Sequence, residues 1–111
     1  MSTIRRADSV TLVDIANNGT TSAAIDFRNY AGGAVAIPSA ITSTTLTFTV
    51  SNSATGTFTA LYDGTNTQSS ITIAASRAYP LPDELFAWPY FKFVLGSAEG
   101  AARVLTFVAK G

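Results

Sequence analysis

The sequence alternates polar and apolar side chains over many short stretches, a period of two that suits β-strands and does not suit helices. The clearest stretch is residues 45–50, where Leu46, Phe48 and Val50 fall on one side of a strand and three threonines on the other. Residues 90–95 are a second, strongly apolar strand candidate. Both patterns predict strands with at least one buried face.

Shorter stretches of the same kind recur at a spacing of roughly 10 residues, which is typical of sandwiches and barrels. Turn-forming residues separate them at 51–56 and 63–66, and Gly32-Gly33 is predicted to end a strand. Barrel closure stays open, but the pattern favours an all-β fold, an antiparallel β-sandwich or jelly roll of about 7–8 short strands. The further predicted strands are residues 11–15, 23–30, 35–37, 57–62, 70–74 and 101–110.

Residues 79–89 interrupt this pattern because they contain three prolines, which remove backbone donors from a sheet. We expect an ordered connection there, with one helical turn over residues 83–86. At 111 residues the chain has the length of one domain. We expect residues 1–10 to form an N-terminal arm and residues 11–111 a single β-sandwich domain.

The surface is predicted to be unusually neutral, because seven Lys and Arg balance seven Asp and Glu and only 13% of residues are charged. Few phosphate charges could be neutralised, so a nucleic-acid partner is not expected. Low net charge favours association with copies of the chain, as a dimer or trimer, or with another protein surface. No secretory signal or apolar segment of bilayer length is evident, so no membrane partner is expected.

The chain has no cysteine and no histidine, which excludes thiolate metal sites and nucleophilic mechanisms that need an imidazole base. Asp83-Glu84 is the one adjacent carboxylate pair, and it fits the first turn of a helix better than a cation site. Asp63-Gly64 fits a turn in the same way. We therefore expect a protein that is not an enzyme and holds no cofactor and no metal.

Two segments are candidates for binding a partner. The first is the N-terminal segment with Arg5, Arg6 and Val10, a short basic arm that could dock on an acidic neighbour or simply carry solvated charge. The second is the aromatic and proline-rich segment with the partner-binding candidates Phe86, Trp88 and Tyr90. Trp88 could equally cap one end of the sandwich.

Several motifs over about residues 22–110 resemble those of a known group of proteins. They are Leu46-x-Phe48-x-Val50-Ser51, Gly56-x-Phe58, Leu61-Tyr62-Asp63, Arg77-Ala78-Tyr79-x-Leu81-Pro82-x-x-Leu85 and Tyr90-x-Lys92-Phe93. Together they resemble small virion proteins of tailed bacteriophages, the β-sandwich decoration or cement proteins encoded near the major capsid gene. The resemblance implies a structural protein on the capsid exterior, made in the host cytoplasm, that binds the major capsid protein and stabilises the shell.

A second resemblance points to a different class of function. A Ser-x-x-x-x-Gly-x-Phe hairpin, from Ser51 to Phe58, is similar to one in discoidin-type sandwiches, which bind glycans. This chain is shorter and lacks the cysteines common there. The alternative is therefore a carbohydrate-binding module, in which Trp88 and the tyrosines would stack against sugar rings.

Overall fold

The computed structural model describes residues 8–28 and 30–110, and this part of the chain is all-β. It contains nine strands and one short 3-10 helix. In chain order these are β1 (Asp8–Ile15), β2 (Ile25–Asp26), β3 (Gly32–Ala36), β4 (Thr45–Ser51), β5 (Thr59–Ala60), β6 (Ser70–Thr72), β7 (Ala78–Pro80), η1 (Asp83–Ala87), β8 (Tyr90–Leu95) and β9 (Arg103–Lys110).

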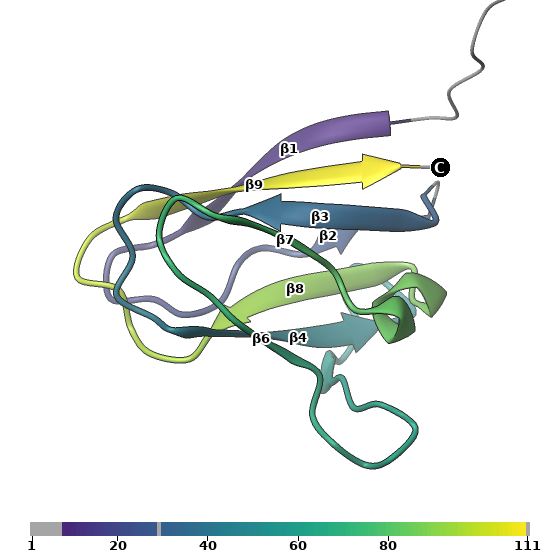
Figure 1. Cartoon of the computed structure of the whole chain (residues 1–111). Coiled ribbons are helices and arrows are strands. Elements are labelled where there is room, and N and C mark those ends of the chain that lie inside the picture. The colour runs from purple at the N-terminus through teal and green to yellow at the C-terminus, as the bar shows by residue number, and fades with distance from the viewer. Residues whose placement is uncertain (1–7, 29, 111) are drawn as a thin grey trace, which may run out of the picture.

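The strands form two antiparallel sheets that stack face to face (Figure 1). Sheet A has the order β1-β9-β3-β7, and sheet B has the order β2-β8-β4-β5, with β6 also pairing with β4. The chain passes from one sheet to the other at almost every connection, as in a jelly roll. Because β5 and β6 both pair with β4, they fill one position between them, so the nine strands occupy eight positions. The predicted all-β sandwich is confirmed.

The core lies between the sheets and is built around phenylalanine rings. Phe91 and Phe93 meet edge to face, with ring centroids 5.2 Å apart, and Phe107 of the opposite sheet lies 5.4 Å from Phe91. Such geometry is favoured between aromatic rings. The alternation in β4 and β8 follows directly, because every second side chain of these strands enters this core. Both strands lie where the sequence predicts them.

Among the described residues of the strand predicted over residues 23–30, only Ile25 and Asp26 form a strand, so the prediction is wrong for the others. The Asp26 carboxylate accepts hydrogen bonds from the Arg28 backbone N–H and side chain, which closes a local turn. The Phe27 carbonyl accepts from the Tyr30 N–H at 3.2 Å. Local hydrogen bonding of this kind competes with strand pairing, so the chain leaves the sheet here.

Three other expectations differ from the structure at the margins of sheet A. The prolines of residues 79–89 predict no regular strand there, yet Pro80 belongs to β7. This is possible because β7 is the last strand of sheet A, so its outer side needs no backbone donor. Gly32-Gly33 is predicted to end a strand, but both glycines lie in β3. At Gly33 the absence of a side chain is required by packing, because a Cβ there would come within 2.7 Å of the Val108 carbonyl oxygen. Strand β1 begins at Asp8, so residues 8–10 of the predicted arm lie in the sheet.

The connection between β7 and β8 contains η1, which confirms the helical turn predicted over residues 83–86. Asp83 and Glu84 occupy its first turn, as predicted. Within the described residues no helix is both long and apolar enough to span a membrane.

Candidate interaction surface

The outward side of sheet A carries apolar side chains that the fold leaves uncovered. Strand β1 turns Val13 and Ile15 into the core and leaves Val10 and Leu12 outside, with exposed fractions of 69% and 67%. Strand β9 does the same with Val108, which is 41% exposed. Sheet A therefore has apolar side chains on both faces. In a sheet with one solvated face, the side chains on that face are normally polar.

The strand register brings these side chains together in two rows that cross the sheet. We call the two rows the outer face of sheet A. Seven of its eight residues are apolar and the eighth is a threonine, so it carries no charge. The first row is Val10, Val108, Ala34 and Pro80, and the second is Leu12, Thr106, Ala36 and Ala78.

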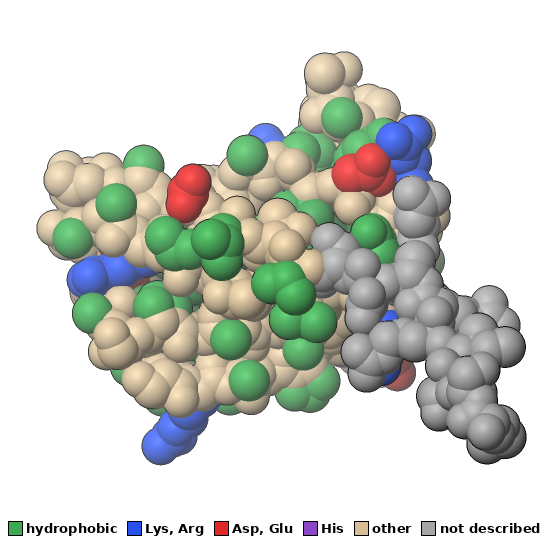
Figure 2. Space-filling model, turned by 90° about the horizontal axis from the view of Figure 1, so that it is seen from above, with side chains coloured by type: hydrophobic (Ala, Val, Ile, Leu, Met, Phe, Trp, Pro, Cys, Tyr) green, Lys and Arg blue, Asp and Glu red, His purple; other side chains and the backbone are tan. Residues whose placement is uncertain are grey.

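Figure 2 views the molecule from the side of sheet A and shows hydrophobic and uncharged side chains over the middle of this surface. Charged residues of the two longest strands flank the pair of rows, Asp14 next to the second row, beside Val104, and Lys110 next to the first row, beside Gly32. At ordinary strand spacings the two rows cover roughly 300 Å². This area is within the range of the largest apolar patch on an ordinary monomeric protein, and such patches are often functional.

The free edge of β1 borders this face. Strand β1 is the first strand of sheet A and pairs with β9 along its whole length, so its other edge has no strand partner within the described residues. A cavity of about 220 Å³ lies beside that edge. Residues 11–14 of β1 and residues 23–25 of the following connection line it. A backbone edge and a small groove are therefore open together.

The partner-binding residues predicted from the sequence do not share one surface. Arg5 and Arg6 lie outside the described residues. Val10 lies on the outer face of sheet A, whereas Tyr90 of β8 points outward from sheet B, on the opposite side of the sandwich. The Arg28 guanidinium lies 5.4 Å from the centre of the Tyr90 ring.

The other two predicted residues lie around η1. Phe86 is half-buried and stacks on Phe27 with ring centroids 5.7 Å apart, so its main contact is with the core. Trp88 is 38% exposed at the end of η1. Only Trp88 of this pair offers much surface to a partner.

The sequence prediction did not single out Leu12, Val104 and Val108. A signal for them exists, because residues 104–108 include the apolar pairs Val104-Leu105 and Phe107-Val108, and a strand with adjacent apolar residues is apolar on both faces. Alternation alone predicts only a last strand over residues 101–110, with no exposed apolar face.

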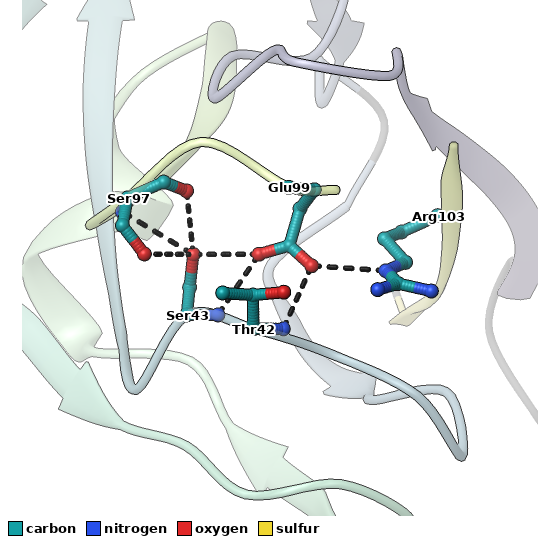
Figure 3. A network of polar contacts seen from close by, with 5 residues as sticks. All are labelled: Thr42, Ser43, Ser97, Glu99 and Arg103. Atoms are coloured by element: carbon teal, nitrogen blue, oxygen red, sulfur yellow. Dashed lines mark hydrogen bonds and ion pairs between the residues drawn. The ribbon is translucent and has the colours of Figure 1, made fainter. Parts of the chain in front are cut away.

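The sequence prediction also missed Glu99, a fully buried carboxylate at the end of the sandwich where the β3–β4 and β8–β9 connections meet (Figure 3). Its carboxylate accepts hydrogen bonds from the Thr42 N–H at 2.8 Å and from the Ser43 N–H at 2.9 Å. The Ser43 hydroxyl lies 2.8 Å away. Arg103 at the start of β9 completes the set with an ion pair of 2.9 Å. Glu99 thus fastens two connections and a strand together.

Burial by itself would raise the pKa of Glu99, but the hydrogen bonds to its carboxylate outweigh burial and lower the pKa to about 2. The largest of these effects come from the Thr42 N–H and the Ser43 hydroxyl. Glu99 is therefore ionised at neutral pH and fully occupied by its neighbours, which suits a structural role and not proton transfer.

Acid should destabilise the protein through Glu99. The unfolded chain takes up a proton near pH 4.5, whereas the folded chain resists protonation until about pH 2, so the contribution is complete above pH 4.5 and falls away between these values. We expect a loss of about 2 kcal/mol in the free energy of unfolding at pH 3 from this group. Urea unfolding at pH 7 and pH 3 measures it.

Asp26 and Asp63, whose pKa values hydrogen bonds also lower, contribute in the same acid range. The control is therefore Glu99→Gln, which should lose less stability than the wild type between pH 7 and pH 3. An equal loss in the two proteins would contradict the role given to Glu99.

Two other acidic residues considered in the sequence, Asp63 and Glu84, accept hydrogen bonds within the fold. One Asp63 carboxylate oxygen accepts from the Thr65 N–H, the Thr65 hydroxyl and the Thr67 N–H. Glu84 accepts a hydrogen bond from the Ser69 hydroxyl. The part of the chain that the structure describes contains no group of three or more His, Cys, Asp or Glu side chains placed to hold a metal ion.

No family model, curated protein or solved structure matches this chain.

Proposed function

We propose that this chain is a non-enzymatic structural protein of a bacteriophage virion, which decorates the capsid exterior and stabilises it by binding the major capsid protein. The observation that carries the proposal is the outer face of sheet A, where two rows of uncharged side chains are left exposed. Burying apolar surface against a partner would stabilise both proteins.

The surface chemistry supports a large protein assembly as the partner. Val10, Leu12 and Val108 would supply apolar contacts, and the alanines of β3 and β7 would let another backbone approach closely. With a net charge of zero, many copies could bind side by side without repelling one another.

The fold is compatible with this role. Jelly rolls occur in viral capsid proteins and also in lectins, so the topology allows the proposal without selecting it. The sequence motifs that resemble capsid decoration proteins point to the first of these classes.

Substitution at the middle of the outer face tests the proposal. Val108 lies between Val10 and Ala34 in its row, so Val108→Lys places a charge where the partner would pack. We expect at least about tenfold weaker binding to empty shells of the major capsid protein encoded in the same genome, because an unpaired charge at an interface costs more than 1.4 kcal/mol. Co-sedimentation with the shells measures the binding.

The matched control is Thr59→Lys, which adds the same charge to an exposed strand residue of sheet B. It should bind like the wild type. Equal binding by wild type and Val108→Lys would contradict the proposed surface, and failure of the wild-type chain to bind would contradict the proposed partner.

Exposed aromatic side chains favour the second candidate, a carbohydrate-binding module. Trp88 is 38% exposed and Tyr62 is 49% exposed. Because Trp88 is the single tryptophan of the chain, its fluorescence reports directly on sugar stacking at that site. A saturable change on titration with glycans would favour this candidate, and an unchanged spectrum would count against it.

A further inference from the structure

The free edge of β1 differs from the other strand edges of the described sandwich. Strand β1 has eight residues, without proline, glycine or lysine. The other sheet ends are formed by β7, β2 and β5, which have three, two and two residues, and β7 contains Pro80. Short edge strands, prolines and charged side chains are among the devices by which proteins prevent edge pairing. Strand β1 is neither short nor interrupted by proline, and Asp14 is its one charged side chain within residues 10–15.

We propose that two copies of this chain associate by antiparallel pairing of their β1 strands, so that sheet A continues from one copy into the other. A two-fold axis perpendicular to the sheet relates the two copies, and each contributes the same edge. Since side chains alternate between the faces, this pairing sets outward residues of one copy against outward residues of the other.

Charge selects the register. Pairing centred on Leu12 places Leu12 of both copies opposite each other and Asp14 of each copy opposite Val10 of the other. Pairing centred on Asp14 would instead place the Asp14 residues of both copies opposite each other, and like charges in directly opposed positions are unfavourable. The register centred on Leu12 therefore combines long overlap with no such pair.

The neighbouring cavity supports an added strand at this edge. Its walls are residues 11–14 of β1 and the small or apolar residues 23–25. In the proposed register Val13 of the second copy lies opposite Thr11, one of the residues that line this cavity. The added strand would thus cover both the backbone edge and the groove beside it.

Pairing would also enlarge the proposed binding face. The outer face of one copy covers roughly 300 Å², well below the ≈800 Å² per partner of a standard interface. A sheet continuous across the two copies would roughly double it, an argument that rests on the proposed function. The pairing itself does not rest on that function, so the two can fail separately.

Single cysteines provide the test, because the chain has none of its own. Leu12 is the position that faces itself across the axis, and it is exposed, so Leu12→Cys should leave the fold intact. We expect this variant to form a disulfide-linked dimer under mild oxidation at least about tenfold faster than a variant whose sulfurs lie beyond disulfide reach.

Three variants serve as controls. In Val10→Cys the two cysteines would lie about 13 Å apart along the strands and could not be bridged. Val108→Cys reports on face-to-face packing of two outer faces, and Thr59→Cys reports on random collision. Sedimentation equilibrium of the wild-type chain should give a mass that rises from one to two chains at concentrations up to about 0.1 mM.

A wild-type chain that stays monomeric over this range would overturn the proposal, as would cross-linking of Leu12→Cys no faster than the controls. Faster linking through Val108→Cys would also overturn it in favour of face-to-face packing. A wild-type chain that dimerises through β1 but fails to bind shells would leave the pairing intact and contradict the proposed function.

Discussion

Replacing Phe93 by alanine is expected to lower the free energy of unfolding by about 4 kcal/mol. Phe93 is fully buried at the centre of the sandwich. Its ring lies 5.2 Å from that of Phe91, 5.8 Å from that of Phe48 and 5.9 Å from that of Phe107, so it contacts rings from both sheets. These neighbours are themselves packed and cannot close the cavity, and the loss would be a large share of a domain's usual 5–15 kcal/mol.

Urea unfolding followed by tryptophan fluorescence measures this loss. The control is Phe58→Ala, because Phe58 is half-buried near the surface with the Lys92 ammonium 4.4 Å from its ring centre. Phe58→Ala should cost about 1 kcal/mol, as expected for a partly exposed ring. Equal losses for the two variants would show that the core is not centred on Phe93.

The second large effect is expected at Glu99, where Glu99→Gln should lower the free energy of unfolding by about 3 kcal/mol at pH 7. The substitution keeps the shape of the side chain but removes the charge that pairs with Arg103. It also turns one acceptor into an NH₂ group that faces the backbone N–H group of either Thr42 or Ser43, because these two donors bind different carboxylate oxygens. A buried donor that meets another donor has lost its hydrogen bond without access to water.

A matched carboxylate-to-amide change at the surface separates this effect from loss of charge alone. Asp26 pairs with Arg28 at 2.8 Å, but both side chains are exposed, so Asp26→Asn should lower the unfolding midpoint much less than Glu99→Gln. If Asp26→Asn and Glu99→Gln unfold at the same urea concentration, the connections at the end of the sandwich do not depend on the Glu99 network.

The fold class was predictable because burial imposes a period of two on strands. Leu46, Phe48 and Val50 show it in β4, and the structure buries all three. The strand ends were less predictable, since they depend on competing local hydrogen bonds such as those of Asp26 and on position in the sheet, as for Pro80.

The candidate surface was only partly predictable, because it depends on which strands become neighbours. Val10 was proposed as a contact residue, but its partners Val108 and Ala34 come from strands far away in the chain. The Glu99 network has the same origin, since Thr42 lies 57 residues from Glu99. Composition predicted a neutral surface, and only the register shows that uncharged side chains gather on sheet A.

A reconstruction by electron cryomicroscopy of shells mixed with the wild-type chain tests the central claim most directly, because it shows which side of the sandwich contacts the capsid. We predict that sheet A faces the shell, with Val10 and Val108 buried in the contact. Bound copies with sheet A turned to solvent, held instead through sheet B or the Trp88 segment, would contradict the account.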